Sequence, residues 1–272
     1  MAGGQGDRKN GKALKMNSPL FSCVIPVKGL RSYFHKAMAS LQNQGVDDAL
    51  EIIVQDGDVE SDAGQSDALN KGFAKARGEW LFWLNADDVL LPGALRKVKD
   101  LIDRMERKGP VEWIAGNTVY IDRHDKVIGT RCDARWRPWF GKYMSVWTGG
   151  PSAFFRRELW EERGGLDVGL RFVMDLDLWT RWAREGIRFE SVDDYLWGFR
   201  VHESSTTCNS ANKSDMSREY QMFLRRYNLR HEQFWRNVAR MVGVFDGTRL
   251  RKARDAAHLR DRSLSVCATM FE

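Results

Sequence analysis

Short apolar runs alternate with longer amphipathic segments through the first 108 residues of the chain. Three runs have the length and composition of strands buried on both faces: 20–26, 51–55 and 79–84. Three segments repeat their apolar side chains at helical spacing: 34–41, 66–77 and 92–108. Because strands and helices alternate, the pattern predicts an α/β fold around a mainly parallel sheet with right-handed crossovers.

The pattern changes after residue 110, where turn residues separate shorter elements. Residues 112–121 and 126–130 flank a polar turn and predict a hairpin. Three short elements follow: an apolar element at 150–157, a helix at 159–163 and a strand at 195–201. We therefore expect one main domain over residues 19–207.

The two ends of the chain differ from this main body. Residues 1–18 are rich in Gly, Lys and Asn and have few bulky apolar side chains, so we expect a disordered tail. Residues 208–272 place apolar side chains such as Phe223, Phe234 and Val238 among arginines, which predicts a basic helical extension.

The composition fits a globular protein with a substantial core: 272 residues, of which 43% are apolar and 11% aromatic. No stretch approaches the roughly 18 uninterrupted apolar residues that span a bilayer, and the N-terminus lacks the apolar core of a signal peptide. We therefore expect a cytoplasmic protein. Its four cysteines are far apart and form no CxxC pair, which argues against a zinc site or a disulfide framework.

The net charge of +6 belongs to the C-terminal extension. Residues 213–272 hold 13 Lys or Arg against 7 Asp or Glu, whereas the first 212 residues hold 30 of each. Basic helices with apolar faces can rest on an anionic membrane, as a peripheral contact on its inner face. Packing on the main body, a homodimer contact or a solvated helix face explains the same pattern. Since the main body is balanced, we expect no nucleic-acid partner.

Two adjacent carboxylates, Asp87 and Asp88, follow the apolar strand at 79–84. Adjacent like charges are unfavourable unless a cation joins them. A manganese or magnesium ion that carries a diphosphate fits this position, because hard oxygen ligands select these metals. An Asp-Asp turn before a helix that starts at Pro92 is the simpler alternative.

Polar or turn-forming residues also follow other strands of the predicted sheet. Pro26 and Asp56 end the first two strands, as Asp87 follows the third. Ligands of open α/β sheets bind beyond the carboxyl ends of the strands. The shared position of these residues therefore favours a binding site over an isolated turn.

Asp175, Asp177 and His202 are further candidates for the site. Carboxylates at the start of a helix are stabilised by its free N–H groups and its dipole. Residues two apart on a helix do not share a face, so we expect Asp175 to project into a cleft and Asp177 to cap the helix or meet Arg181. His202 ends the last strand of the main body, where it is either structural or a ligand.

Seven segments, in this order, resemble the motifs of the family 2 glycosyltransferases. They are 22–26, 51–57, 64–72, 85–88, 164–167, 174–181 and 200–202. The resemblance implies a GT-A fold, which is Rossmann-like, in an inverting enzyme. Such an enzyme uses a divalent metal and moves a sugar from a nucleotide-sugar donor to a hydroxyl of a glycan or lipid-linked acceptor. The implied setting is cell-surface polysaccharide or glycolipid biosynthesis.

On the donor side, the resemblance implies a nucleoside pocket and a metal site. Four residues match positions that contact the nucleoside: Pro26, Asp56, Asp67 and Asn70. Asp87 and Asp88 stand where the family binds ribose, metal and diphosphate, and His202 where many relatives approach the metal. The metal would neutralise charge that grows on the departing nucleoside diphosphate.

On the acceptor side, Asp175 matches the carboxylate that serves as the general base of the family. It would take the proton of the acceptor hydroxyl as that oxygen attacks the anomeric carbon. A non-catalytic binding protein with the same fold and an impaired donor pocket is the alternative function.

The chain departs from the family pattern at three places. Asn85 is the neutral variant of a position that is often acidic, and Lys28 stands in a segment where the family has an aromatic residue and an asparagine. Only six residues, 58–63, replace a helix and an edge strand, although a parallel crossover needs about 10–12 residues. We therefore expect a missing edge strand and a more open nucleotide pocket, with weaker nucleotide binding or a partner that covers the gap.

Overall fold

The computed structural model describes residues 18–29, 31–46, 49–107, 109, 111–132, 140–187, 189–245, 248–265 and 267. The tail expected at 1–18 lies outside these residues except for Ser18. The strands are β1 Phe21–Val27, β2 Leu50–Asp56, β3 Trp80–Trp83, β4 Val89–Leu90, β5 Trp113–Ile121, β6 Val127–Arg131, β7 Ala153–Arg156 and β8 Phe189–Arg200. The helices of the main body are α1 Phe34–Gln42, α2 Gln65–Lys75, α3 Ala94–Glu106, α4 Phe140–Tyr143, α5 Arg157–Arg163 and α6 Met174–Arg184.

All described strands belong to one mixed sheet. Its order is β2-β1-β3-β7-β5-β8-β4, and β6 pairs with β5 beside this path. β1 runs parallel to β2 and β3, and β5 runs parallel to β8. β7 lies between these two sets and is antiparallel to both of its neighbours. The α/β fold and the β5–β6 hairpin are therefore as predicted, whereas the sheet is mixed because β4, β6 and β7 run antiparallel to their neighbours.

Two features of the strands differ from the predicted pattern. β8 begins at Phe189, six residues before the expected 195–201, because its first half pairs with β5 through residues such as Glu190 and Ser191 that form no apolar run. β4 has only two residues, Val89 and Leu90, and pairs with the far side of β8. Such a short strand has no period of its own, so the sequence shows only a turn there.

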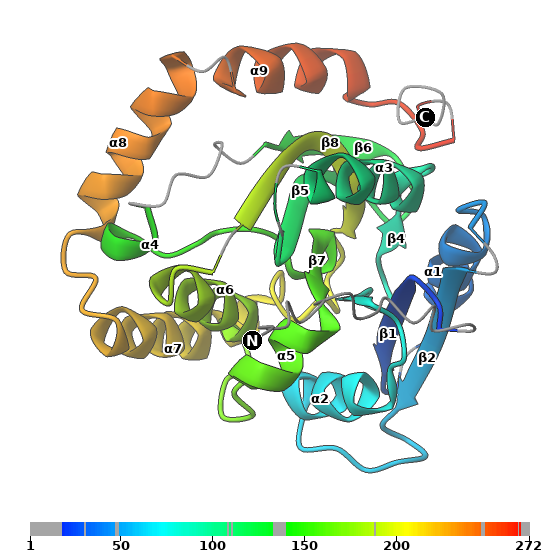
Figure 1. Cartoon of the computed structure of the whole chain (residues 1–272). Coiled ribbons are helices and arrows are strands. Elements are labelled where there is room, and N and C mark those ends of the chain that lie inside the picture. Colours follow the sequence, from blue (N-terminus) through cyan, green and yellow to red (C-terminus); the bar gives the residue numbers. More distant parts are fainter. Residues whose placement is uncertain are drawn as a thin grey trace, which may run out of the picture.

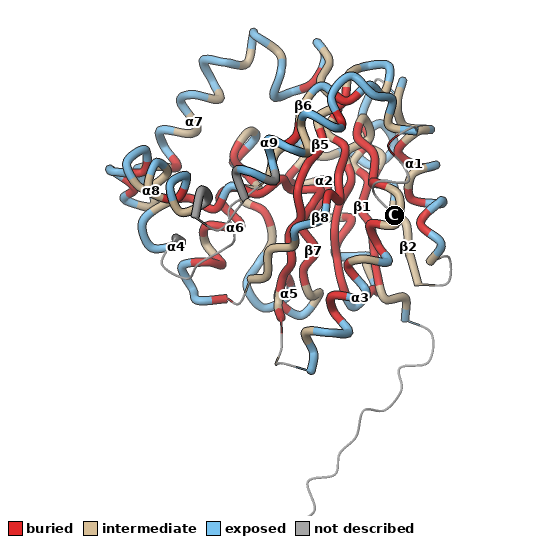
Figure 2. Tube along the Cα trace, turned by 90° about the horizontal axis from the view of Figure 1, so that it is seen from above, coloured by how far each residue is buried: buried red, intermediate tan, exposed pale blue. Residues whose placement is uncertain are grey.

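Alternating side chains of the strands build two apolar layers, one on each face of the sheet. From β3, Leu81 and Trp83 pack with α2, α5 and α6, whereas Trp80 and Phe82 pack with α1 and α3. Figure 1 shows the sheet between these helices, and Figure 2 shows its strands as the most buried part of the chain. Burial on both faces explains why β1 and β3 read as continuous apolar runs.

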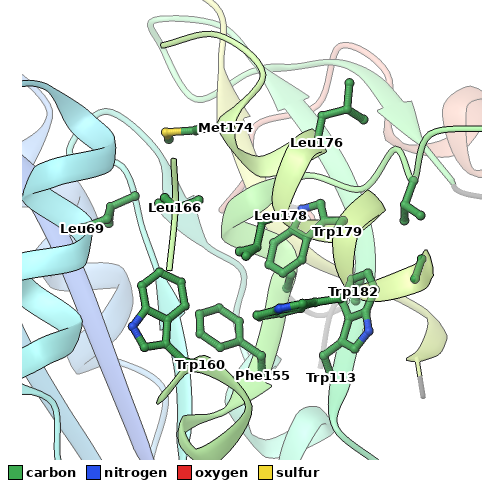
Figure 3. Packing of buried hydrophobic residues seen from close by; sticks show 14 of the residues in the cluster. Leu69, Trp113, Phe155, Trp160, Leu166, Met174, Leu176, Leu178, Trp179 and Trp182 are labelled. Carbon is green, nitrogen blue, oxygen red and sulfur yellow. The ribbon is translucent and has the colours of Figure 1, made fainter. Parts of the chain in front are cut away.

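Aromatic rings fill the layer under α6 (Figure 3). Trp179 of α6 stacks on Trp113 of β5 with ring centroids 4.9 Å apart and on Trp83 of β3 at 5.7 Å. Trp182, one turn further along α6, meets the edge of Trp113 and of Phe155. These contacts fix α6, and with it the helix start that carries Asp175, against the centre of the sheet.

The C-terminal extension forms α7 Lys213–Arg226, α8 Glu232–Phe245 and α9 Thr248–Leu259, which follow one another in an arc around the main body (Figure 1). Phe223 of α7 belongs to the core under α6, and Leu259 of α9 packs with strands β4, β5 and β6. The extension is therefore helical, as predicted, and part of it packs on the main body. Among the described residues, no helix is both long and apolar enough to cross a bilayer.

The outer edge of β2 is open in the described part of the chain. β2 pairs with β1 alone, and the segment that follows it forms a turn and loop up to the start of α2 at Gln65. Val54 of β2 is 40% exposed and Val59 beyond it is 84% exposed. The strand that the family pattern would place at this edge thus has no counterpart in the described segment 57–64.

Candidate functional site

A cavity of about 360 Å³ opens beyond the carboxyl ends of β1 and β3, as the position of the polar residues predicted. Its wall comes from the loops after these strands, from the start of α2 and from the segment after β8. Polar and aromatic lining residues include Lys28, Tyr33, Gln65, Asn85, Asp87, His202 and the run Ser204 to Thr207. A polar cleft of this size, at the switch from strands to loops, suits a small charged ligand.

The loop between β3 and β4 turns its two adjacent carboxylates in different directions. Asp88 is fully buried and accepts hydrogen bonds from the backbone N–H of Arg200 (2.8 Å) and from Nδ2 of Asn85 (2.8 Å). Burial, and then the nearby charge of Asp87, raises the pKa of the Asp88 carboxyl well above its usual range. Asp88 is not among the residues that line the cavity, so the structure does not bring it to the expected metal site.

Asp87 faces the cavity and meets His202. Its side chain is 33% exposed, and Oδ2 lies 2.9 Å from Nε2 of His202, whose side chain is 14% exposed. The ring of Tyr33 lies beside the imidazole, with ring centroids 5.3 Å apart. A carboxylate oxygen and an imidazole nitrogen that open into one polar cavity can both ligate a divalent cation such as manganese.

Manganese would need further ligands beyond this pair. In the part of the chain that the structure describes, no group of three or more His, Cys, Asp or Glu side chains is arranged to hold a metal. Asp87 and His202 therefore fit a cation whose remaining positions are filled by water and by the phosphates of a ligand, as magnesium and manganese commonly accept.

Arg200 holds this loop in place from behind. The guanidinium is fully buried and donates to the carbonyl oxygens of Asp87 (2.8 Å, from Nε) and Asp122 (2.9 Å, from Nη1). It also pairs with Asp125 at 2.6 Å and lies over the ring of Tyr33 at 4.6 Å. A buried cation needs such partners, because leaving it unpaired costs several kcal/mol, on the order of 3–5.

The expected nucleoside contacts divide between the cavity and the scaffold. Pro26 lines the cavity. Asp56 lies at the end of β2, where Arg31 contacts both of its carboxylate oxygens at 2.7 Å and holds the pKa of this carboxyl below its usual value. Asp56 is not among the lining residues, although its ion pair with Arg31 is exposed to solvent.

Asp67 and Asn70 of α2 make contacts within the protein. Asp67 accepts from the backbone N–H of Ala63 (2.9 Å) and pairs with Lys71 (2.9 Å). The amide of Asn70 both donates to and accepts from the backbone of Leu166, at 2.9 and 3.0 Å. Neither lines the cavity, so their positions give them a role in fixing the loops around it.

Asp175 lies in the first turn of α6 and is partly buried. Desolvation raises the pKa of its carboxyl, while hydrogen bonds from the backbone N–H groups of Leu176 (2.7 Å) and Gly150 and the charge of Arg131 act in the opposite direction. A carboxylate that is partly desolvated yet still held by N–H donors is a stronger proton acceptor than a free one.

Ser66 connects this helix start to the cavity. Its Oγ contacts Sδ of Met174 (3.0 Å) and the carbonyl oxygen of Leu170 (2.8 Å). The neighbouring residue, Gln65, lines the cavity and donates to Asn85 at 2.8 Å. The structure thus brings the loop of Asp87 and the helix start of Asp175 to the same end of α2.

The side chains that bind Asp177 are not the one expected, Arg181. The Asp177 carboxylate is buried and accepts from Arg226, the last residue of α7, and from the hydroxyl of Tyr227, which follows it, both at 2.9 Å. Arg181 instead donates to the carbonyl oxygen of Gly165 at 2.6 Å. The expected i,i+4 pair is wrong, because a partner distant in sequence and close in space occupies the carboxylate.

Some site residues carry little signal in the sequence. Tyr33 precedes α1 and belongs to no periodic pattern, and Gln65 is one polar residue at a helix start. The run Ser204 to Thr207 after His202, which also lines the cavity, can be recognised in the sequence. Four consecutive small hydroxyl residues in a loop suit phosphate or sugar contacts.

Comparison with known proteins shows which family this chain resembles. Residues 58–160 match the model of the family described as Glycosyl transferase family 2. This part of the chain is similar to family 2 glycosyltransferases. Its curated relatives include an uncharacterized glycosyltransferase of Rickettsia typhi, 22% identical over 72% of this chain and 68% of the relative. Another, of Methanocaldococcus jannaschii, is 21% identical over 82% of this chain and 84% of the relative.

Solved structures support the GT-A fold of this chain. S. aureus TarS 1–349 in complex with UDP-GlcNAc has a TM-score of 0.55 and 15% identity, over 70% of this chain and 61% of that structure. The mannosyltransferase PcManGT of Pyrobaculum calidifontis, in complex with GDP-Man and Mn²⁺, has a TM-score of 0.52 and 17% identity, over 70% and 59%. The chain thus spans about three fifths of each of these structures.

Separate roles for the two carboxylates predict separate effects of their removal. Asp88→Ala leaves the Arg200 N–H and the Asn85 amide without a buried acceptor, so we expect it to lower the free energy of unfolding by about 1–3 kcal/mol. Asp87→Ala removes a partly exposed side chain, so we expect a change within about 0.5 kcal/mol. Urea unfolding of both variants measures the difference. An equal loss of stability in the two variants would contradict this assignment.

Proposed function

We propose that this protein is a metal-dependent, inverting glycosyltransferase that moves a sugar from a nucleoside-diphosphate donor to a hydroxyl acceptor. The observation that carries the proposal is the pair of Asp87 and His202 in a polar cavity beyond the strand ends of a GT-A fold. The proposed setting is cytoplasmic, in cell-surface polysaccharide or glycolipid biosynthesis.

The donor end of the site is built to hold a diphosphate and its counter-ion. Asp87 and His202 would hold manganese or magnesium, which when bound neutralises negative charge on the leaving nucleoside diphosphate. The hydroxyls of the run Ser204 to Thr207 and the amide of Gln65 can donate to phosphate or sugar oxygens. Lys28 lines the same cavity, although its ammonium pairs with Asp62 at 3.3 Å.

Asp175 is the proposed general base. A single displacement that inverts the anomeric carbon needs a base that takes the proton of the acceptor hydroxyl on the face opposite the leaving group. Burial strengthens the carboxylate as a base, and the N–H donors Leu176 and Gly150 fix its orientation. Asp175 thus supplies proton transfer, while Asp87 and His202 act on the leaving group.

A panel of nucleotide sugars tests this function directly. We expect release of nucleoside diphosphate from at least one uridine- or guanosine-diphosphate sugar in the presence of manganese, and loss of this activity with a chelator. Asp87→Ala should abolish the metal-dependent thermal stabilisation by nucleoside diphosphate, because it removes the charged ligand of the cation. If no nucleoside diphosphate stabilises the protein even with manganese, the result favours the alternative function, a binding protein with an impaired donor pocket.

Asp175→Asn should lower sugar transfer by about 10²–10⁴-fold, because an amide cannot accept the proton. Donor binding should remain, since Asp175 is not among the cavity-lining residues. In the unaltered protein, the raised pKa predicts that kcat falls as the pH drops below that pKa and the carboxylate becomes protonated. Asp194→Asn, at a half-exposed position of β8, is the matched control. Full activity of Asp175→Asn would overturn the assignment.

We also propose that the basic extension makes a peripheral contact with an anionic membrane, where a lipid-linked acceptor would lie. On α8, Phe234 and Met241 are 61% and 63% exposed and lie seven residues apart, on one helix face. Arg240 is exposed beside Met241, and Arg230 is exposed just before the helix. An apolar stripe flanked by arginines matches an interfacial helix.

Sedimentation with liposomes tests this membrane contact on the full chain. We expect binding to phosphatidylglycerol vesicles that weakens with salt and little binding to phosphatidylcholine vesicles. The double variant Phe234→Ser with Met241→Ser should lose this binding, whereas Val168→Ser, an equally exposed apolar residue of the main body, should keep it. Concentration-dependent dimerisation that the double variant abolishes, without vesicle binding, would assign the stripe to a homodimer instead.

A further inference from the structure

A side chain of the C-terminal extension holds the segment that leads into α6. The carboxylate of Glu219, on α7, accepts hydrogen bonds from the backbone N–H groups of Arg171 (3.1 Å), Phe172 (2.6 Å) and Val173 (2.8 Å). Val173 is the N-cap residue directly before α6, and its own side chain makes no capping hydrogen bond. Glu219 thus supplies, from another helix, an acceptor for the N–H of the N-cap residue and for the two N–H groups before it.

The same face of α7 also contacts α6 at a second place. Phe223, one turn after Glu219, is 2% exposed within the core. Arg226 and Tyr227, a further turn along, both donate to the buried carboxylate of Asp177. Positions 219, 223 and 226–227 share one face of a helix. α7 is therefore attached on both sides of Asp175: to residues 171–173 before it and to Asp177 after it.

We propose that Glu219 is a positioning residue for Asp175. The inference rests on the proposed function, in which Asp175 is the base. Val173 lies two residues before Asp175, so the three N–H groups bound to Glu219 set where the first turn of α6 starts. Bonds to an ionised acceptor are shorter and stronger than neutral ones, and 2.6–2.8 Å lies in their range.

The position of the cavity separates this role from donor binding. The cavity is lined by residues up to Thr207, and none of its lining residues belongs to α7. Removal of the Glu219 carboxylate should therefore leave the donor KM unchanged. A displacement of about 1 Å at a reacting group can cost on the order of 10²-fold in rate, so we expect kcat to fall by about 10–100-fold.

Four variants of the full chain test the proposal by kinetics. Glu219→Ala should lower kcat, and Glu219→Gln, which keeps one acceptor oxygen, should recover part of the loss. In the Asp175→Asn background, Glu219→Ala should cause no further loss of the residual transfer, because Glu219 acts through Asp175. Gln221→Ala, at an exposed position of the same helix, should behave as the unaltered protein. An unchanged kcat in Glu219→Ala, or an additive loss in the double variant, would overturn the proposal.

Hydrogen exchange provides a readout that does not depend on activity. In Glu219→Ala, the amides of residues 171–176 should lose protection, while those of β1 and β3 should exchange as in the unaltered protein. Unchanged protection of 171–176 would overturn the proposal whether or not the protein transfers a sugar. If the unaltered protein transfers no sugar from any donor, the proposed function fails, and the exchange result still decides whether Glu219 fixes this segment.

Discussion

The hydrogen bond from the backbone N–H of Arg200 to the carboxylate of Asp88 joins the two halves of the site. It ties the loop after β3, which carries Asp87, to the end of β8, which leads to His202. Burial of the Asp88 carboxyl is unfavourable for its charged form and raises its pKa. The hydrogen bonds of Asp88 nevertheless fix the loop so that Asp87 lies 2.9 Å from His202. The residue that a metal would contact is thus placed by its buried neighbour.

This arrangement depends in turn on parts of the chain far from the cavity. Arg200 pairs with Asp125 in the β5–β6 turn, and the same carboxylate pairs with Lys36 of α1. Near the C-terminus, the backbone N–H of Leu264 donates to the carbonyl oxygen of Asp125 (2.8 Å). Ser263 forms an isolated antiparallel β-bridge with Lys126. The extension therefore supports both ends of the site, with its last described residues behind Arg200 and with α7 behind Asp175.

The sequence predicted the features that depend on local pattern. β1 and β3 are buried on both faces, so their apolar runs were visible, and the polar residues at their ends marked the correct edge of the sheet. The different roles of Asp87 and Asp88 had no such signal. Both carboxylates lie in the turn between β3 and β4, and only the position of Arg200 decides which of them is buried.

Long-range packing explains the other differences from the sequence prediction. Asp177 and Asn70 lie in motifs that resemble the family, yet their partners, Arg226 and Leu166, are 49 and 96 residues away. The antiparallel direction of β7 depends on how the chain returns between β3 and β5, which its four residues do not encode. Contacts of this kind become visible only when the sheet order is known.

The two ends of the cavity are stabilised by interactions of different strength. At the end of the cavity near His202, the side chains of Asp88 and Arg200 are fully buried, so loss of either one leaves buried polar groups without a partner. At the end near β2, the shortened segment after this strand is fastened to residues 28–31 by contacts whose cations are 41–59% exposed. These are the pairs Lys28 with Asp62, Arg31 with Asp56 and Arg31 with Asp58, together with the N–H of Gly29 on Asp58.

Exposed ion pairs of this kind contribute little, with a median of about 0–1 kcal/mol each. The loop that stands where the family pattern has an edge strand can therefore rearrange at small cost, whereas the loop of Asp87 cannot. A rigid site binds with less loss of conformational entropy than a mobile one. Under the proposed function, the diphosphate and its metal would therefore supply more of the donor affinity than the nucleobase does.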